Sequence, residues 1–235
     1  MLREEAEHLK IHKPDEYKNI WLGEIKDSSK TAVVKYFNKD NINDNIAYCK
    51  DLPIYLSMDF NVDPMMWILS HKTKDKIFVF DEIVMENVTT QDAINEFVER
   101  YKGHKAKIII NGDASGNYRK TQSKFSDYAI IRNALVKVGL EVDFDIRGFN
   151  PPIKSRVNAF NQMVYGNDGV RRWFCHSRCK WLVYNMKNLK YKVGTSDFDL
   201  PSFSQIGKDE SLKFLGHIFD AASYQVEYYF PVLKE

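Results

Sequence analysis

Three short hydrophobic segments follow one another closely between Ile54 and Val84, and they limit the folds open to this chain. They lie at 54–60, 65–70 and 77–84. Each has the alternation or the apolar run of a half-buried or buried β-strand. The connections between them are too short for a crossover helix, so the sequence predicts an antiparallel meander.

After this meander the pattern changes to alternating helices and strands. Thr89 is the expected N-cap of a helix that ends at Tyr101. We predict further strands at 107–111, 140–146 and near Trp173. We predict further helices at 126–138, after Pro152, at 178–188, and from Glu210 or Leu215 to Tyr229. The fold class predicted is α/β, a mixed sheet of an antiparallel meander plus parallel strands, flanked by helices on both faces.

Residues 1–51 differ from the rest of the chain. Helices are predicted at Leu2–Leu9 and Asp15–Gly23, and the sequence is then polar from Lys26 to Asp51. We interpret residues 1–51 as a linker or weakly packed segment, and we expect the main domain to occupy residues 52–235.

The composition is that of a globular protein, with 44% hydrophobic and 28% charged residues. No apolar run is long enough to cross a membrane. The net charge of +2 means that nucleic-acid binding would need local clusters of basic residues. Three cysteines, an odd number, favour a reducing compartment. Cys175 and Cys179 lack a second pair of zinc ligands, which favours structural or free thiols.

Three aspartates stand where a metal site could form. Asp59 lies near the end of the first strand, on the face opposite Met58, and Asp113 follows the strand at 107–111. Asp220 lies in the last predicted helix among apolar neighbours. Mg²⁺ and Mn²⁺ prefer such oxygen ligands, and two ions about 3.5–4 Å apart can hold the attacking water and the leaving oxygen of a phosphodiester. Each aspartate alone is also consistent with an ordinary turn or a solvated surface.

Other polar residues extend this hypothesis. His217 lies three residues before Asp220, on the same helix face, where it could ligate a metal, bind a phosphate or shuttle a proton. Asp63 and the pair Asp81 and Glu82 are further candidates for outer carboxylates. Basic residues that could contact DNA phosphates are Arg119, Lys120, Lys154 and Arg156. The alternative for these four is a solvated rim.

The ordered set of motifs resembles the C-terminal nuclease domain of terminase large subunits from tailed bacteriophages. These motifs are Met58-Asp59-Phe60, Asn111-Gly-Asp-Ala114, Asn150-Pro-Pro-Ile-Lys-Ser-Arg-Val-Asn158 and His217-Ile-Phe-Asp220. The segment Pro14–Glu24 resembles the one that closes the family's motor ATPase region. The resemblance implies an RNase H-like fold and an acidic cluster that binds one or two Mg²⁺ or Mn²⁺ ions. It implies that Asp59, Asp113 and Asp220 are the metal-binding aspartates, with His217 beside the last one.

The resemblance also implies an activity and a setting. Terminase nucleases cut double-stranded concatemeric viral DNA during genome packaging. In the full-length protein the expected partners are the ATPase domain, the portal and the small terminase subunit. The expected location is the host cytoplasm, outside the mature virion and without a membrane. The segment Lys190–Phe203 falls where some members have a hairpin near the active site.

The sequence contains no match to the P-loop motif G-x-x-x-x-G-K-[ST]. We therefore expect a piece of such a protein that cleaves DNA and does not translocate it. Two alternatives stay open. One is another RNase H-like nuclease, of the resolvase or transposase type. The other is a non-catalytic module that docks DNA or a capsid component.

Overall fold

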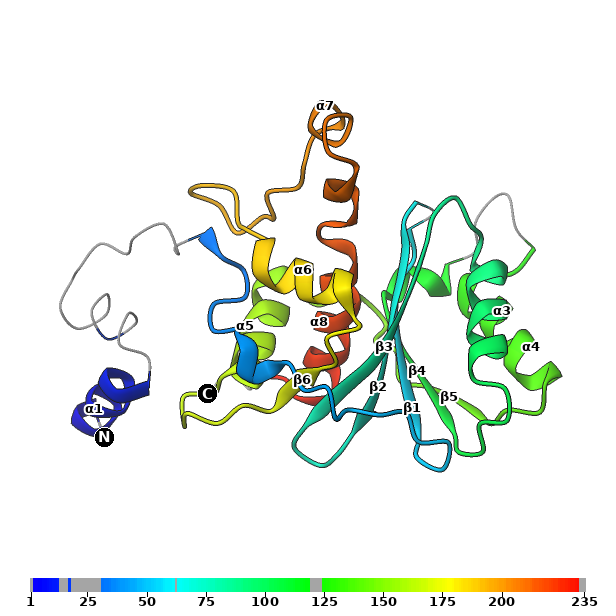
Figure 1. The fold of residues 1–235 in the computed structure, drawn as a ribbon, viewed down its shortest axis with the longest axis horizontal. Coiled ribbons are helices and arrows are strands. Elements are labelled where there is room, and N and C mark those ends of the chain that lie inside the picture. Colours follow the sequence, from blue (N-terminus) through cyan, green and yellow to red (C-terminus); the bar gives the residue numbers. More distant parts are fainter. Residues whose placement is uncertain (1, 13–16, 18–30, 62, 119–123, 233–235) are drawn as a thin grey trace.

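The computed structural model describes residues 2–12, 17, 31–61, 63–118 and 124–232 (Figure 1). Its centre is a six-stranded sheet with the strand order β5-β4-β1-β2-β3-β6. The strands are β1 (Ile54–Asp59), β2 (Met65–Lys72), β3 (Ile77–Met85), β4 (Ile108–Gly112), β5 (Val142–Phe144) and β6 (Trp173–Cys175). The first three strands pair antiparallel, whereas β4, β5 and β6 each pair parallel to a neighbour. The predicted mixed sheet is confirmed.

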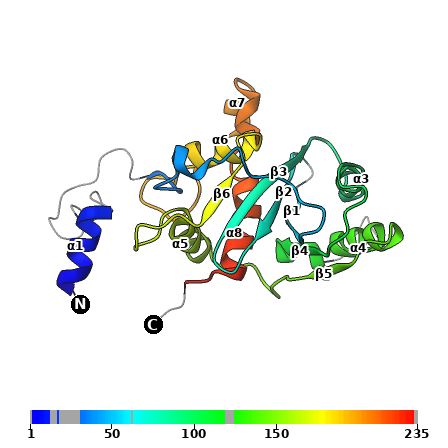
Figure 2. The same cartoon turned by 60° about the horizontal axis from the view of Figure 1, so that its bottom comes forward.

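Helices cover both faces of this sheet, as predicted (Figures 1 and 2). One face carries α3 (Thr90–Arg100) and α4 (Asp127–Lys137). The other face carries α5 (Ile153–Val164), α6 (Lys180–Asn188) and α8 (His217–Tyr229). The remaining helices are α1 (Leu2–His12), α7 (Phe203–Ile206), and the 3₁₀ turns η2 (Lys39–Asn41), η3 (Ala114–Asn117) and η4 (Glu210–Phe214).

The alternation of side chains along β1 divides the interior into two cores. Ile54, Leu56 and Met58 are fully buried in the core beneath α3 and α4. Ser57 and Asp59 point to the opposite face, where Ser57 Oγ donates a hydrogen bond to the carbonyl oxygen of Ala221 in α8. This is the division of faces that a period of two predicts. It places the polar side of β1 against α8.

The segment that precedes the sheet packs more tightly than predicted. Val33 and Val34 are buried in the core beneath α5, α6 and α8. The side-chain amide of Asn41, itself fully buried, donates to the carbonyl oxygens of Val164 and Trp173 at 3.0 and 2.9 Å. The domain boundary near Leu52 stays a prediction, and the predicted helix at 15–23 lies outside the described residues except for position 17. Burial of this segment follows from contacts distant in sequence, which its polar composition does not reveal.

The last helix begins later than predicted. Gly216 has a φ of +102°, and η4 precedes it, so α8 starts at His217. Asp220 therefore lies in the first turn of α8 and not in its middle. The positive end of a helix dipole stabilises a carboxylate at this position. None of the described helices has the length and apolar character needed to cross a membrane.

Candidate active site

The ends of β1 and β4 bring Asp59 and Asp113 side by side. The two strands run parallel with Met58 opposite Gly112, and the amide of Asp113 donates to the carbonyl oxygen of Met58 at 3.1 Å. Asp59 follows Ser57 on the α8 side of the sheet, and Asn111 shares that side because Ser57 Oγ reaches its side chain. Neighbouring strands lie about 4.8 Å apart. The two carboxylates therefore follow adjacent positions of neighbouring strands, which is the adjacency that a shared site would require.

Gly112 makes this close approach possible. Its φ is +138°, and a Cβ atom there would lie 2.3 Å from the carbonyl oxygen of Met58. No other residue fits both the dihedral angle and the contact. The loop after it is secured by the hydroxyl of Tyr128, which donates to the carbonyl oxygen of Asp113 at 2.8 Å.

Helix α8 brings His217 and Asp220 to the same edge. It packs against β1 and β4, and His217 Nδ1 lies 3.2 Å from Asp59 Oδ2. A buried side chain of α6 fixes where this helix starts. Asn185 accepts a hydrogen bond from the amide of Gly216 at 2.6 Å and donates one to the carbonyl oxygen of Phe214 at 2.9 Å.

Each of the three carboxylates is held through one oxygen. Asp59 Oδ2 accepts a hydrogen bond from the side-chain amide of Asn61. Asp113 Oδ1 accepts from the side chain of Asn150 at 2.6 Å and from a backbone amide at 2.7 Å. Asp220 Oδ1 accepts from Arg156 Nη1 at 2.5 Å. Asp59 is buried, with an exposure of 6%, and the side chain of Asp220 is 25% exposed.

The charges of Asp59, Asp113 and Asp220 all affect the pKa of Tyr224, which lies one turn after Asp220 in α8. Burial raises the pKa of the Tyr224 hydroxyl, and the charges of Asp220, Asp113 and Asp59 raise it further against the opposing effect of Arg156. His217 Nδ1 lies 3.2 Å from Asp59 Oδ2, so the first turn of α8, which also carries Asp220, lies on the same side of the molecule as the ends of β1 and β4.

The electrostatics of the site follow from burial and proximity. Burial raises the pKa of Asp220, Arg156 opposes this, and the charge of Asp59 adds to it, so the pKa stays above its ordinary value. Burial lowers the pKa of His217, but its hydrogen bond to Asp59 and the charges of Asp59 and Asp220 outweigh this and raise it. His217 therefore holds a proton more readily than an exposed histidine.

The donor chemistry of these residues suits a hard divalent cation, because such cations prefer carboxylate oxygens. As the side chains are placed, no three His, Cys, Asp or Glu residues of the described chain stand close enough together to hold a metal ion. Asn61, Asn150 and Arg156 each donate a hydrogen bond to one of the three carboxylates.

The predicted basic residues lie in different settings. Lys154 is exposed in the first turn of α5, near the edge that carries Asn150. Arg156 is buried, with a side-chain exposure of 6%, and it pairs with Asp220 and does not face solvent. Arg119 and Lys120 lie outside the described residues.

Two other candidates have structural partners. Asp81 accepts from the hydroxyl of Tyr101 at 2.6 Å, and Glu82 accepts from the amides of Trp181 and Leu182 at the start of α6.

Sequence reasoning missed the residues that hold the acids. Asn61 stands two positions after Asp59, and Asn150 opens the motif that continues to Arg156. Asn61 is close to Asp59 in the sequence, whereas Asn150 lies 37 residues from Asp113 and only the fold brings the two together. Asn185 carries no sequence signal, because it sits in an ordinary helical pattern.

No protein-family model matches this sequence, and no curated protein sequence matches it significantly. Several solved structures are similar in fold, and large terminases and their nuclease domains are among them. The large terminase of a thermophilic bacteriophage superposes with a TM-score of 0.59 at 13% identity, covering 97% of this chain and 52% of that chain. This chain therefore spans about half the length of that terminase. The P22 large terminase nuclease domain gives 0.53 at 11% identity, covering 83% of this chain and 96% of that chain.

These likenesses bear on fold. They agree with the mixed sheet predicted from the sequence, which has the strand order β5-β4-β1-β2-β3-β6. Identities of 11% and 13% carry nothing about ligands or partners. Within the described residues, this chain folds as the nuclease domain of a large terminase does.

Proposed function

We propose that this protein is a metal-dependent DNA endonuclease, the nuclease part of a terminase large subunit, which cuts double-stranded concatemeric viral DNA during genome packaging. The observation that supports this most directly is the placement of Asp59 and Asp113 after adjacent strand positions, with the first turn of α8, which carries His217 and Asp220, against Asp59. Hydrolysis of a phosphodiester needs a site that stabilises negative charge as it develops. Carboxylates are the ligands that divalent cations able to do this prefer.

The proposed roles follow from the geometry. Asp59, Asp113 and Asp220 hold one or two Mg²⁺ or Mn²⁺ ions, which when bound polarise the phosphate and lower the pKa of water. Asn61 and Asn150 fix the carboxylates of Asp59 and Asp113. His217 lies against Asp59 with a raised pKa. It orients that carboxylate and, when protonated, can give a proton to the departing 3′ oxygen.

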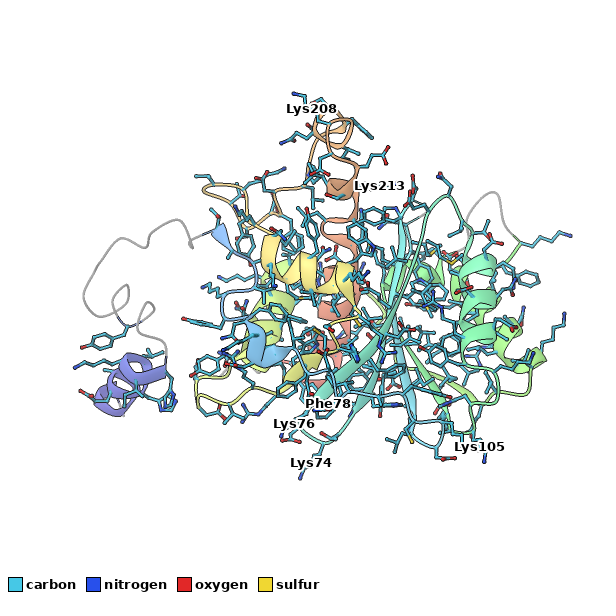
Figure 3. All side chains as sticks on the ribbon, viewed as in Figure 1. Lys74, Lys76, Phe78, Lys105, Lys208 and Lys213 are labelled. Atoms are coloured by element: carbon cyan, nitrogen blue, oxygen red, sulfur yellow. The ribbon has the colours of Figure 1, made fainter. Side chains whose placement is uncertain are left out.

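Duplex DNA would reach the site across the end of the molecule where α8 begins. Figure 3 shows Lys208 and Lys213 at this end and Lys74, Lys76 and Lys105 at the opposite end. Lys213 pairs with Glu86, whereas Lys208 is exposed.

We propose that Lys154, with Arg119 and Lys120, contacts the phosphate backbone, which positions DNA without reading its sequence. Arg156 is left out of this set because it is buried.

The wider setting is proposed with the function. In a full-length protein the partners would be an ATPase domain, the portal and the small terminase subunit, in the host cytoplasm. The terminase of the thermophilic phage, of which this chain spans about half, motivates the search for a preceding motor domain.

The test is nicking of supercoiled plasmid in Mn²⁺ by the wild-type chain and by Asp59→Asn and Asp220→Asn. Both variants should lose at least about 100-fold in rate, because each loses a charged ligand. Asp51→Asn is the matched control, since Asp51 is exposed before the other end of β1. Circular dichroism checks that all chains are folded.

Undiminished nicking by either variant would contradict the proposed mechanism. Nicking confined to four-way junctions would assign the fold to a resolvase-type activity. DNA binding that is indifferent to Mn²⁺ and yields no nicks would indicate a docking module.

A further inference from the structure

A pocket opens between η3, α4 and the end of β5, at the edge of the sheet that β5 forms (Figure 1). Its volume is about 410 Å³, within the range of about 300–1,000 Å³ that ligand sites occupy. Tyr128 lines the pocket, and its hydroxyl donates to the carbonyl oxygen of Asp113 at 2.8 Å. Asn117 also lines it and is the last residue of η3, which begins directly after Asp113. A 3₁₀ helix rises about 2.0 Å per residue, so this pocket lies within about 8 Å of chain from Asp113.

Two aromatic rings and a guanidinium line this pocket. The rings of Tyr128 and Phe144 meet edge to face with their centres 5.8 Å apart. The guanidinium carbon of Arg132 lies 4.3 Å from the centre of the Phe144 ring. Nucleobases stack on aromatic rings and on guanidinium planes, so these three side chains offer surfaces of the kind that a base contacts.

The polar side chains of the pocket are not used by the fold. Asn117 and Asn133 line it, and the side chain of neither has a hydrogen-bond partner among the residues that the structure describes. A side-chain amide both donates and accepts, and it can pair with the edge of a base. Arg132 is exposed and forms no ion pair with any described residue. None of the described residues that line the pocket is acidic, so its charge favours an anionic ligand.

Exposed aromatic side chains surround the same region of the chain. Tyr118 follows Asn117 and Phe125 precedes Ser126, and both of these rings are more than half exposed. Phe149 is exposed as well and precedes Asn150, whose side chain donates to Asp113. Exposed rings beside a nucleic-acid site serve as platforms for unpaired bases. In a duplex the faces and the edge of a base are already occupied by stacking and pairing, so only an unpaired base can use such a pocket.

We propose that this pocket holds one unpaired nucleobase of DNA next to the candidate active site. Tyr128 and Phe144 contact the base, Asn117 and Asn133 bind its edge, and Arg132 offsets the charge of the phosphate attached to it. The inference rests on the proposed function, because it takes DNA as the substrate, and it adds the form of DNA that binds best: a duplex with an unpaired nucleotide.

The test compares two short duplexes that carry 2-aminopurine, a fluorescent base whose emission falls when it stacks. In one duplex this base is paired with thymine, and in the other it forms a one-nucleotide bulge. Both are titrated with the whole chain without divalent metal, so that no DNA is cut. The wild-type chain should bind the bulged duplex at least about 10-fold more tightly and quench its emission, because the base stacks in the pocket.

Variants of two exposed side chains of α4 locate the binding site. Arg132→Ala and Asn133→Ala should each reduce the preference for the bulged duplex by about 5-fold, because each removes a polar contact with the base or its phosphate. Lys137→Ala is the matched control. Lys137 is an exposed basic residue in the last turn of the same helix and does not line the pocket, so the preference should stay unchanged. Circular dichroism checks that all chains are folded.

The outcomes separate this inference from the proposed function. Equal affinity of the wild-type chain for the two duplexes would overturn the inference, and plasmid nicking would still support the nuclease. An unchanged preference in both pocket variants would also overturn it, because the bulge would then bind elsewhere. Tight binding of free 2-aminopurine nucleotide, with equal affinity for the two duplexes, would assign the pocket to a free nucleotide instead of DNA. A preference for the bulge in a chain that does not nick plasmid would contradict the nuclease proposal alone.

Discussion

Asp59, Asp113 and Asp220 are held by three chemically different neighbours. Asn61 and Asn150 are neutral amides, and a metal ion can compete with them for a carboxylate. Arg156 is charged and buried, and the structure gives it no other anionic partner among the described residues. At the scale of single residues, the carboxylates of Asp59 and Asp113 can therefore reorient, whereas that of Asp220 is fixed by Arg156.

The position of Asp113 depends on the absence of a side chain at the residue before it. Gly112→Ala should destabilise the chain by about 1–3 kcal/mol, because φ is +138° and the new Cβ would meet the carbonyl oxygen of Met58. Mn²⁺ affinity should fall with it, since the amide of Asp113 bonds to that carbonyl oxygen. Urea denaturation and Mn²⁺ titration measure the two effects.

Gly148→Ala is the matched control for this change. A Cβ at Gly148 would have nothing within 4 Å, so both measurements should stay near the wild-type values. Equal stability of the two variants would show that the approach at Gly112 is not needed to place Asp113.

Helix α8 is the element on which the site depends, because it supplies His217 and Asp220 and also covers β1. Its polar contacts with the sheet include hydrogen bonds from Ser57 Oγ to the carbonyl oxygen of Ala221 and from Ser70 Oγ to the side chain of Gln225. Its start is set by Asn185 of α6. Because the start of α8 is fixed, the first turn of the helix has one orientation. His217 and Asp220 both lie in that turn.

Asn185→Leu should therefore uncouple the start of α8 from α6. The change leaves the amide of Gly216 and the carbonyl oxygen of Phe214 buried and unpaired, at a cost of about 1–3 kcal/mol each. Urea denaturation measures the loss. Asn188→Leu is the control, since Asn188 lies on the exposed side of the same helix and bonds only to the carbonyl oxygen of Tyr184. Similar losses in both variants would contradict the assigned role of Asn185.

The segment that leads into β1 is tied to the sheet by a neutral histidine. His71 Nε2 accepts from the amide of Cys49 at 3.0 Å, while Nδ1 donates to the carbonyl oxygen of Pro53 at 2.8 Å. Burial lowers the pKa of His71 below its ordinary 6.5. If Nε2 of His71 were protonated, its N–H would face the backbone N–H of Cys49, and two hydrogen-bond donors would be in contact.

This arrangement predicts a pH dependence with a definite sign. Because the folded pKa of His71 is lowered, its contribution is complete above pH 6.5 and is lost as the pH falls through the folded pKa. Burial, aided by the charge of His71, lowers the pKa of His104 as well. The melting temperature should fall between pH 7.5 and pH 5, and His71→Gln should show a flatter slope. Identical slopes for the two chains, measured by circular dichroism, would exclude His71 as a cause.

At the scale of the whole molecule, the sheet separates two cores that share no helix. One core lies beneath α3 and α4, and the other beneath α5, α6 and α8. The second core is completed by Val33 and Val34, and Asn41 joins the ends of α5 and β6. The site lies at the edge of the second core.

A chain that begins at Leu52 should consequently be less stable than one that begins at residue 31. The shorter chain lacks two buried valines and the two hydrogen bonds of Asn41. Together these contribute several kcal/mol to the free energy of unfolding, so the melting temperature should fall by about 10 °C or more. Equal melting temperatures would support a domain boundary at Leu52. Scanning calorimetry of the two chains makes the comparison.

Sequence alone determined the order and type of the elements and the candidate acids. Burial repeats every two residues in strands and every three or four in helices, so local pattern reveals β1 to β4 and the main helices. Asp59 and Asp113 stood out because each follows a strand, and the ordered motifs added Asp220 and His217. The start of α8 was misplaced because Gly216 adopts a positive φ that no periodicity signals.

Only the tertiary structure decided which neighbour holds each acid and how the N-terminal segment packs. Arg156 and Asp220 lie 64 residues apart, and Asn41 and Trp173 lie 132 apart. Such pairs form when two close-packed cores assemble on one sheet. Their formation depends on all the elements together and not on local sequence. A basic residue in a polar motif therefore looked like a phosphate contact from the sequence, whereas the packing of α5 on α8 turned it inward as the counterion of Asp220.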